Sequence, residues 1–175
     1  SDPAFGLLPN QSVAVTNLDD EVAGFTIVNP GAKTVDEGGT LTETFGLVLD
    51  AQPEGSVRLD ITSQDEGEAT TSPNVVTFQP GAWDVEQIIT IQGVDDSEID
   101  NPQTFNIVVS VDQSASDALF VGVTDQTVEV TNTDNDLAAL LVNEFGSVSV
   151  SEFGTTDVFE VALTSAPASN VVLTI

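Results

Sequence analysis

The chain repeats itself over a long period, and this feature constrains its fold more than any other. Residues 1–24 match residues 116–139 without a gap, so that Asn17 recurs as Asn132 at an offset of 115 positions. The positions that are identical at this offset are Ser1, Asp2, Phe5, Gln11, Val13, Val15, Thr16, Asn17, Asp19 and Ala23. A period of 115 residues is too long for a solenoid unit and suits an independent β-sandwich domain in a tandem array.

The match continues into the last part of the chain. Glu37 is followed by Gly39-Thr40 as Glu152 is followed by Gly154-Thr155, and after one deletion residues 45–61 map onto residues 159–175. We therefore predict three parts. Residues 1–16 are the closing strand of a preceding repeat, residues 17–131 are one complete repeat, and residues 132–175 are the opening strands of a following repeat.

Short apolar segments in the complete repeat have the alternation or the length of β-strands. They are residues 45–49, 57–61, 75–78, 88–91, 105–111 and 128–130. Turn sequences rich in Pro, Gly and Asn separate them, and no stretch shows a sustained helical period. This pattern predicts an all-β fold, a Greek-key β-sandwich of the immunoglobulin-like kind with about seven strands.

Charge limits the partners of the chain. Asp and Glu number 29, Lys33 and Arg58 are the only basic residues, and the formal net charge is −27. Nucleic acids and anionic membranes are themselves polyanions, so we expect neither as a partner. No segment approaches the ~20 apolar residues of a membrane helix, so we expect no membrane insertion. The repulsion among carboxylates must be relieved by bound cations or, alternatively, by a salt-rich solvated surface.

The chain contains no Cys, His, Met or Tyr. Disulfides, the usual zinc and copper sites, and Ser-His or Cys-His nucleophiles therefore have no residues to form them. Paired carboxylates of the kind used by glycoside hydrolases remain. Because each acidic pair is better interpreted as a set of metal ligands, we expect the chain not to be an enzyme.

Acidic residues gather at the loops between the predicted strands. The groups are Glu37, Asp65-Glu66, Asp95-Asp96 with Glu98 and Asp100, and Asp134-Asn135-Asp136. Calcium takes six to eight oxygen ligands in proteins, and close carboxylates repel one another unless a cation lies among them. Alternate loops of a sandwich lie at the same end, so these groups can meet there. A solvated set of acidic loops is the alternative.

The complete repeat resembles a Calx-beta domain over its whole length. The segments that carry the resemblance are residues 35–39, 62–69, 76–83, 89–91 with 94–100, 104–105 and 128–136. The resemblance implies a calcium cluster at one end of the sandwich. Its implied ligands are Glu37, Asp65, Asp95, Asp96, Asp100, Asp134 and Asp136, together with the backbone carbonyl of Glu98.

Two departures from the acidic pattern lower the negative charge of the implied cluster. Gln103 stands where calcium-rich members carry Glu, and Asn135 interrupts what is otherwise a run of Asp. We therefore expect about one to three calcium ions. Asp19, Asp20 and Glu21 occupy the same place one repeat earlier, and we expect them, like Glu152, to belong to sites completed by other repeats.

These observations predict a calcium-binding structural or adhesive module of a secreted or cell-surface array, in which calcium stiffens the junctions between repeats. The expected partners are neighbouring repeats of the same chain or like subunits in a filament. A polysaccharide- or ligand-binding extracellular module is the alternative, with a cell-surface or matrix polysaccharide as its partner. The single Trp and the absence of Tyr provide few aromatic platforms for a sugar. A calcium sensor is a further alternative.

Overall fold

The computed structural model describes residues 3, 9, 11–18, 20–146 and 149–174. In these residues the fold is all-β apart from one short 3₁₀ helix, η1 (Ala118–Phe120). The strands are β1 (Phe25–Val28), β2 (Lys33–Asp36), β3 (Thr42–Leu49), β4 (Val57–Ser63), β5 (Ala69–Ser72), β6 (Val75–Phe78), β7 (Gln87–Gly93), β8 (Gln103–Val111), β9 (Gln126–Thr133), β10 (Leu140–Glu144) and β11 (Phe159–Leu163). No helix in this part of the chain is long and apolar enough to cross a membrane.

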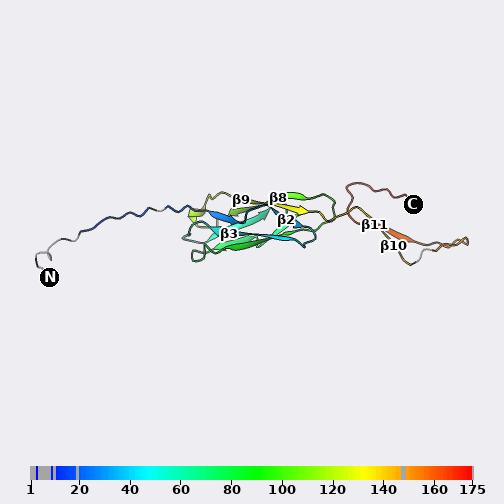
Figure 1. The fold of residues 1–175 in the computed structure, drawn as a ribbon, viewed down its shortest axis with the longest axis horizontal. Coiled ribbons are helices and arrows are strands. Elements are labelled where there is room, and N and C mark those ends of the chain that lie inside the picture. Colours follow the sequence, from blue (N-terminus) through cyan, green and yellow to red (C-terminus); the bar gives the residue numbers. More distant parts are fainter. Residues whose placement is uncertain (1–2, 4–8, 10, 19, 147–148, 175) are drawn as a thin grey trace.

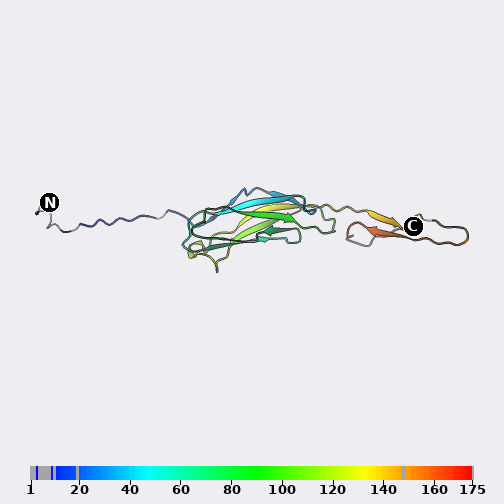
Figure 2. The same cartoon turned by 90° about the horizontal axis from the view of Figure 1, so that it is seen from below.

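Strands β1 to β9 form two sheets that pack face to face (Figures 1 and 2). A four-stranded sheet has the order β1-β3-β7-β5 and a five-stranded sheet has the order β2-β9-β8-β4-β6. Strand β2 runs parallel to β9, and the other pairs are antiparallel. The prediction of an all-β, immunoglobulin-like sandwich is confirmed, with nine strands in place of about seven. The strands not predicted, β1, β2 and β5, have four residues each, which is too short for alternation to stand out in the sequence.

The core lies between the sheets and follows the alternation of the strands. Every second residue of β4 faces inward, and Val57, Leu59 and Ile61 are buried there. The facing sheet contributes Phe45, Leu47 and Leu49 of β3 and further buried residues of β1 and β7. Trp83 packs against this core and is partly buried.

At one end of the sandwich the inward-facing positions change from apolar to polar. In β9 the inward series Val128, Val130 ends in Asn132, and in β4 it ends in Ser63. In β7 the series ends in Gly93, where a Cβ would lie 2.3 Å from the backbone oxygen of Asp36. This end, called here the polar end, therefore has small and polar side chains where the rest of the interior is apolar.

Strands β10 and β11 repeat the pairing of β1 and β3. Phe25 pairs with Leu49 in the first hairpin, and Leu140 pairs with Leu163 in the second, which is the register that the sequence repeat predicts. The backbone N–H of Asp50 donates to Gly24 O at 2.9 Å, and that of Thr164 donates to Ala139 O at 3.0 Å. The boundaries at residues 16 and 131 stay predictions.

The sequence repeat also predicts strands at residues 12–16, 148–150 and 171–175, and these strands are not formed in the described residues. Residues 11–16 are extended without strand pairing, and residues 149–150 and 171–174 are also outside strands. The equivalent segments of the complete repeat are strands because they pair with neighbouring strands. The terminal parts do not contain those neighbours among the described residues, and a strand needs a partner for its backbone groups. Residues 148 and 175 lie outside the described part of the chain.

Candidate metal centre

Loops from several strands converge at the polar end of the sandwich. Glu37 follows β2, Asp65 follows β4, the segment 94–101 joins β7 to β8, and residues 134–136 follow β9. Because β9 is parallel to β2 and antiparallel to β8, and β8 is antiparallel to β4, the ends of β2, β4 and β9 meet the start of β8. The topology therefore gathers the predicted ligand segments at one end.

Three of the predicted ligands form a compact group. Glu37, Asp134 and Asp136 each have a carboxylate oxygen within 4.8 Å of those of the other two. Calcium lies about 2.3–2.6 Å from its oxygen ligands, so two oxygens bound to one ion are at most about 5 Å apart. The spacing of the group is compatible with one shared cation.

Backbone amides hold this group in place. The N–H of Asn135 donates to Glu37 Oε2 at 3.2 Å, which ties the segment after β9 to the residue after β2. Asp134 accepts from the N–H of Asn101 at 3.0 Å and from the N–H of Asp136 at 2.7 Å. Asp134 thus links the 94–101 loop to the segment that leaves the sandwich.

Several buried oxygens near this group have no hydrogen-bond donor. They are Asp100 Oδ1, Asn132 Oδ1 and Asp136 Oδ2, and they are the buried side-chain atoms of the described residues that lack a partner. An unpaired buried polar atom costs about 1–3 kcal/mol, and native structures contain few of them. All three are hard oxygen donors at the polar end, which is the chemistry that calcium prefers.

Glu37 is a desolvated carboxylate, with 3% of its surface exposed. Burial raises the pKa of Glu37, the N–H of Asn135 opposes this, and the charges of Asp134, Asp96 and Asp100 raise it further. The carboxylates of Asp96 and Asp100 therefore repel that of Glu37. The predicted residues Asp96 and Asp100 therefore belong to the same electrostatic cluster.

Glu68 is a member of this cluster that the sequence analysis did not propose as a ligand. It is 8% exposed, and Asn132 Nδ2 donates to its Oε2 at 3.1 Å. Burial raises the pKa of Glu68, the Asn132 amide lowers it, and the charges of Asp100, Asp65 and Asp96 raise it again. The available signal was its place in the acidic segment 65–68, directly before buried Ala69.

The other predicted ligands are exposed residues at the rim of the cluster. Asp65 Oδ1 accepts from the N–H of Gly67 at 3.1 Å, and Asp96 Oδ1 accepts from the N–H of Glu98 at 2.7 Å. Asp95 Oδ1 accepts from Asn135 Nδ2 at 3.2 Å. The backbone of Glu98 pairs with Ala166 in an isolated parallel bridge. Metal binding by these four residues stays a prediction.

The two amides that replace carboxylates in the acidic pattern act as hydrogen-bond donors. Asn135 bonds to Asp95, and Gln103 Nε2 donates to the carbonyl oxygens of Asp100 at 2.8 Å and Asn101 at 3.3 Å. They fix the loop that carries the carboxylates and add no negative charge.

Both basic side chains of the chain are engaged away from this group. Lys33 Nζ lies 3.7 Å from Glu43, and Arg58 Nε lies 2.9 Å from Asp60 and 3.4 Å from Asp112. Among the described residues, the cluster carboxylates thus have no ion pair with a Lys or Arg. No basic side chain among these residues neutralises the charge of Glu37, which is buried, or those of Asp134 and Asp136, which are half-buried.

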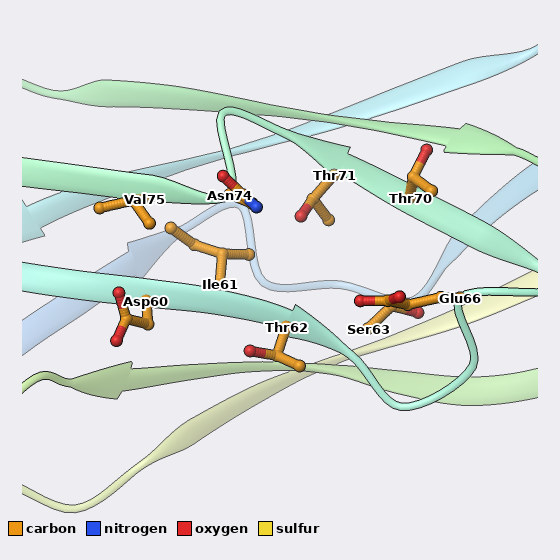
Figure 3. Close-up of a pocket in the computed structure, with 9 residues that line it drawn as sticks. All are labelled: Asp60, Ile61, Thr62, Ser63, Glu66, Thr70, Thr71, Asn74 and Val75. Carbon is orange, nitrogen blue, oxygen red and sulfur yellow. The ribbon is translucent and has the colours of Figure 1, made fainter.

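A separate groove lies at the open edge of the sandwich, between β4, β5 and β6 (Figure 3). Its volume is about 420 Å³, and polar side chains including Asp60, Thr62, Ser63, Thr70 and Asn74 line it. No aromatic residue is in its lining, so it lacks the stacking platform that a sugar-binding site usually has. It does not include the Glu37–Asp134–Asp136 group.

The sequence matches no protein-family model and no curated protein. Similar solved structures include the apo form of the Calx CBD1 domain, with 20% identity over 66% of this chain and 100% of that chain and a TM-score of 0.46. The calcium-binding domain CBD12 of CALX1.1 is 14% identical over 80% of this chain and 70% of that chain, with a TM-score of 0.43. Domains 4 and 5 of the S-layer protein SbsC are 18% identical over 71% of this chain and 52% of that chain, with a TM-score of 0.45.

Proposed function

We propose that this chain is a calcium-binding structural module, and that calcium at the polar end stiffens the junction between the sandwich and the segment that follows it. The observation that carries the proposal is the group of Glu37, Asp134 and Asp136. Its carboxylates are close together and partly or fully buried, without an ion pair to Lys or Arg among the described residues.

The donor set favours calcium over other metals. The chain has no His or Cys, so nitrogen and sulfur ligands of zinc or copper are missing. Carboxylate and amide oxygens suit calcium and magnesium, and magnesium requires a nearly ideal octahedron with several waters. Oxygens supplied by several loops at uneven spacing fit the flexible coordination of calcium better.

The residues that would hold the ion connect two parts of the chain. Glu37 belongs to the sandwich, whereas Asp134 and Asp136 lie on the segment that leaves it. Asp136 also accepts a hydrogen bond from Ser165 Oγ at 2.9 Å, so it touches the next structural unit directly. A bound cation would supply the positive charge that allows these segments to remain together, and its removal would leave repelling carboxylates at the junction.

Such a module would serve as one link in an extended secreted or cell-surface array, with a structural or adhesive role and no catalysis. The 115-residue repeat and the shared register of β1–β3 and β10–β11 support the array. The site residues proposed here are Glu37, Asp134 and Asp136, completed by Asp65, Asp95, Asp96, Asp100 and the carbonyl of Glu98. Neighbouring repeats or like subunits are the proposed partners.

Isothermal titration of the chelator-treated chain with calcium tests the proposal. We expect saturable binding, and a rise in melting temperature with calcium, because the ion binds the folded state. Asp136→Asn should weaken binding, whereas Asp125→Asn, which changes an exposed carboxylate before β9, should leave it unchanged. A chain that shows neither saturable heat nor a calcium-dependent melting temperature would rule the proposal out.

A further inference from the structure

The segment after β11 docks on the loop of residues 94–101, called here the acidic loop. The N–H of Ala166 donates to Ser97 O at 2.6 Å, and Ala166 pairs with Glu98 in a parallel bridge. Beside this contact, Ser165 Oγ donates to Asp136. The turn of residues 165–167 is therefore a receptor for the acidic loop of the repeat before it.

The internal repeat places an equivalent turn at the other end of the complete repeat. Ala51, Gln52 and Pro53 correspond to Ser165, Ala166 and Pro167, and Glu21 corresponds to Asp136. The identical pairing registers of the two hairpins support this correspondence. The segment of residues 20–24 enters the sandwich at the end opposite to β10 and β11 (Figure 1).

A cavity of about 550 Å³ lies at this entry end and combines both features. Its lining, called here the proximal pocket, consists of Glu21, Val22, Ala23, Asp50, Ala51, Gln52, Trp83, Leu119 and Phe120. It thus contains the counterpart of Asp136 and the counterparts of Ser165 and Ala166. The pocket therefore shares these three positions with the observed junction, and Trp83, Leu119 and Phe120 add an apolar wall.

The walls of the proximal pocket are preformed. Asp117 accepts from the N–H of Leu119 at 2.9 Å and from the N–H of Gly55 at 2.6 Å, which fixes η1 against the turn after β3. The side chain of Gln52 is held by a hydrogen bond from its Nε2 to Pro80 O at 2.8 Å. The backbone N–H of Gln52 has no hydrogen-bond acceptor among the described residues. Leu119 is 64% exposed although it lies on this fixed wall.

We propose that the proximal pocket is a docking surface for the acidic loop of the preceding repeat, a loop with the chemistry of Val94–Asn101. The backbone N–H of Gln52 would bond to the loop as that of Ala166 bonds to Ser97. Each repeat would then carry an acidic loop at one end and its receptor at the other. This arrangement gives a head-to-tail interface that continues without closing.

Docking at this pocket depends on calcium, and in this respect the inference rests on the proposed function. Glu21 lines the pocket and corresponds to Asp136, so the cation proposed at Asp136 has its counterpart position here. Ala51 also lacks the hydroxyl with which Ser165 bonds to Asp136 at the other junction. A cation would therefore supply here the link between turn and acidic segment that Ser165 supplies at the other junction.

A chain with two complete repeats tests the proposal. Residues 1–133 followed by residues 19–175 restore a preceding repeat and keep the natural Asp19-Asp20-Glu21 segment. Trp83→Phe in the first copy leaves Trp83 of the second copy as the sole tryptophan, and this residue lines the pocket. With calcium, we expect acrylamide quenching of Trp83 to fall about two-fold relative to the 175-residue chain, because docking covers the indole. Chelation should reverse the fall.

Leu119→Glu in the second copy should abolish the protection, since it puts a charge opposite the acidic loop. Val121→Glu is the matched control, because Val121 is 49% exposed and outside the pocket lining. Equal quenching of the joined and original chains, or protection that survives Leu119→Glu, would overturn the docking surface. Calorimetry on the same chain separates the two proposals. Calcium binding without protection refutes docking alone. Protection without calcium binding supports the docking surface but refutes its dependence on calcium and the proposed metal.

Discussion

The replacement Glu37→Gln should act in opposite directions on the metal-free and the calcium-bound protein. The glutamine has nearly the same shape as the glutamate and carries no charge. Glu37 is almost fully buried, and its carboxylate lies within 4.8 Å of that of Asp134. Removing its charge therefore removes a repulsion that, among the described residues, no basic side chain and only the hydrogen bond from Asn135 offsets.

The size of the effect follows from these contacts. Two unit charges at the 4.8 Å limit repel by about 3 kcal/mol when the effective dielectric constant is about 20. The hydrogen bond from the N–H of Asn135 to Glu37 weakens on loss of the charge, which costs about 1 kcal/mol. We expect the free energy of unfolding of the metal-free chain to rise by about 2 kcal/mol. Calcium affinity should fall about ten-fold or more, because a charged ligand is lost.

Urea denaturation in chelator and in excess calcium measures both effects. Glu129→Gln, on the exposed face of β9, is the control and should change neither value. The reasoning is refuted if Glu37→Gln destabilises the metal-free chain, or if it leaves the calcium affinity as it was.

Three further results are expected. Without calcium, thermal stability should rise as the pH falls from neutral toward 4.5, because the raised pKa values of Glu37 and Glu68 make the folded state bind more protons than the unfolded state. Thermal stability should fall again below pH 3.8. Hydrogen bonds lower the pKa values of four carboxyl groups in the folded state, and protonation removes this contribution; the residues are Asp36, Asp112, Asp117 and Asp157. Melting curves across this pH range check both signs. Ser165→Ala removes the hydrogen bond to Asp136 and should weaken calcium binding about two- to five-fold in calorimetry, with Ser149→Ala as the control. An unchanged calcium affinity would show that the contact of Ser165 with Asp136 does not contribute to the metal site. Gly93→Ala should destabilise the chain by more than about 2 kcal/mol in denaturation experiments, because its Cβ would clash with backbone, whereas Gly81→Ala meets open space and should be tolerated.

Alternation made the longer strands of the fold predictable from the sequence. Strands β4, β8 and β9 carry three or more inward positions, so their period is visible without a structure. Strand β2 shows why the shorter ones were missed. It has two inward positions, and one of them is Lys33, whose buried stem and ion pair with Glu43 do not look like a core residue in the sequence.

The candidate site was predictable in its segments and only partly in its atoms. Glu37, Asp134 and Asp136 follow strands that end together, and loop position alone was enough to propose them. Glu68 and Asn132 were not proposed, although Asn132 keeps the inward register of Val128 and Val130. A polar residue in register with core positions is a signal that the sequence does contain. The distances among the loop carboxylates depend on backbone bonds such as that from Asn101 to Asp134, and no spacing in the sequence encodes them.

The central claim, that calcium holds the junction after β9, can be tested by distance measurements across it. The chain has no native cysteine, so spin labels can be placed at Thr77→Cys on β6 and Asn143→Cys on β10, both exposed positions. Thr77→Cys with Thr127→Cys, within the sandwich, is the control pair and should give the same distances with and without calcium. We predict that the distribution across the junction is narrow in saturating calcium and broad after chelation. Distributions of equal width in the two conditions would contradict the account.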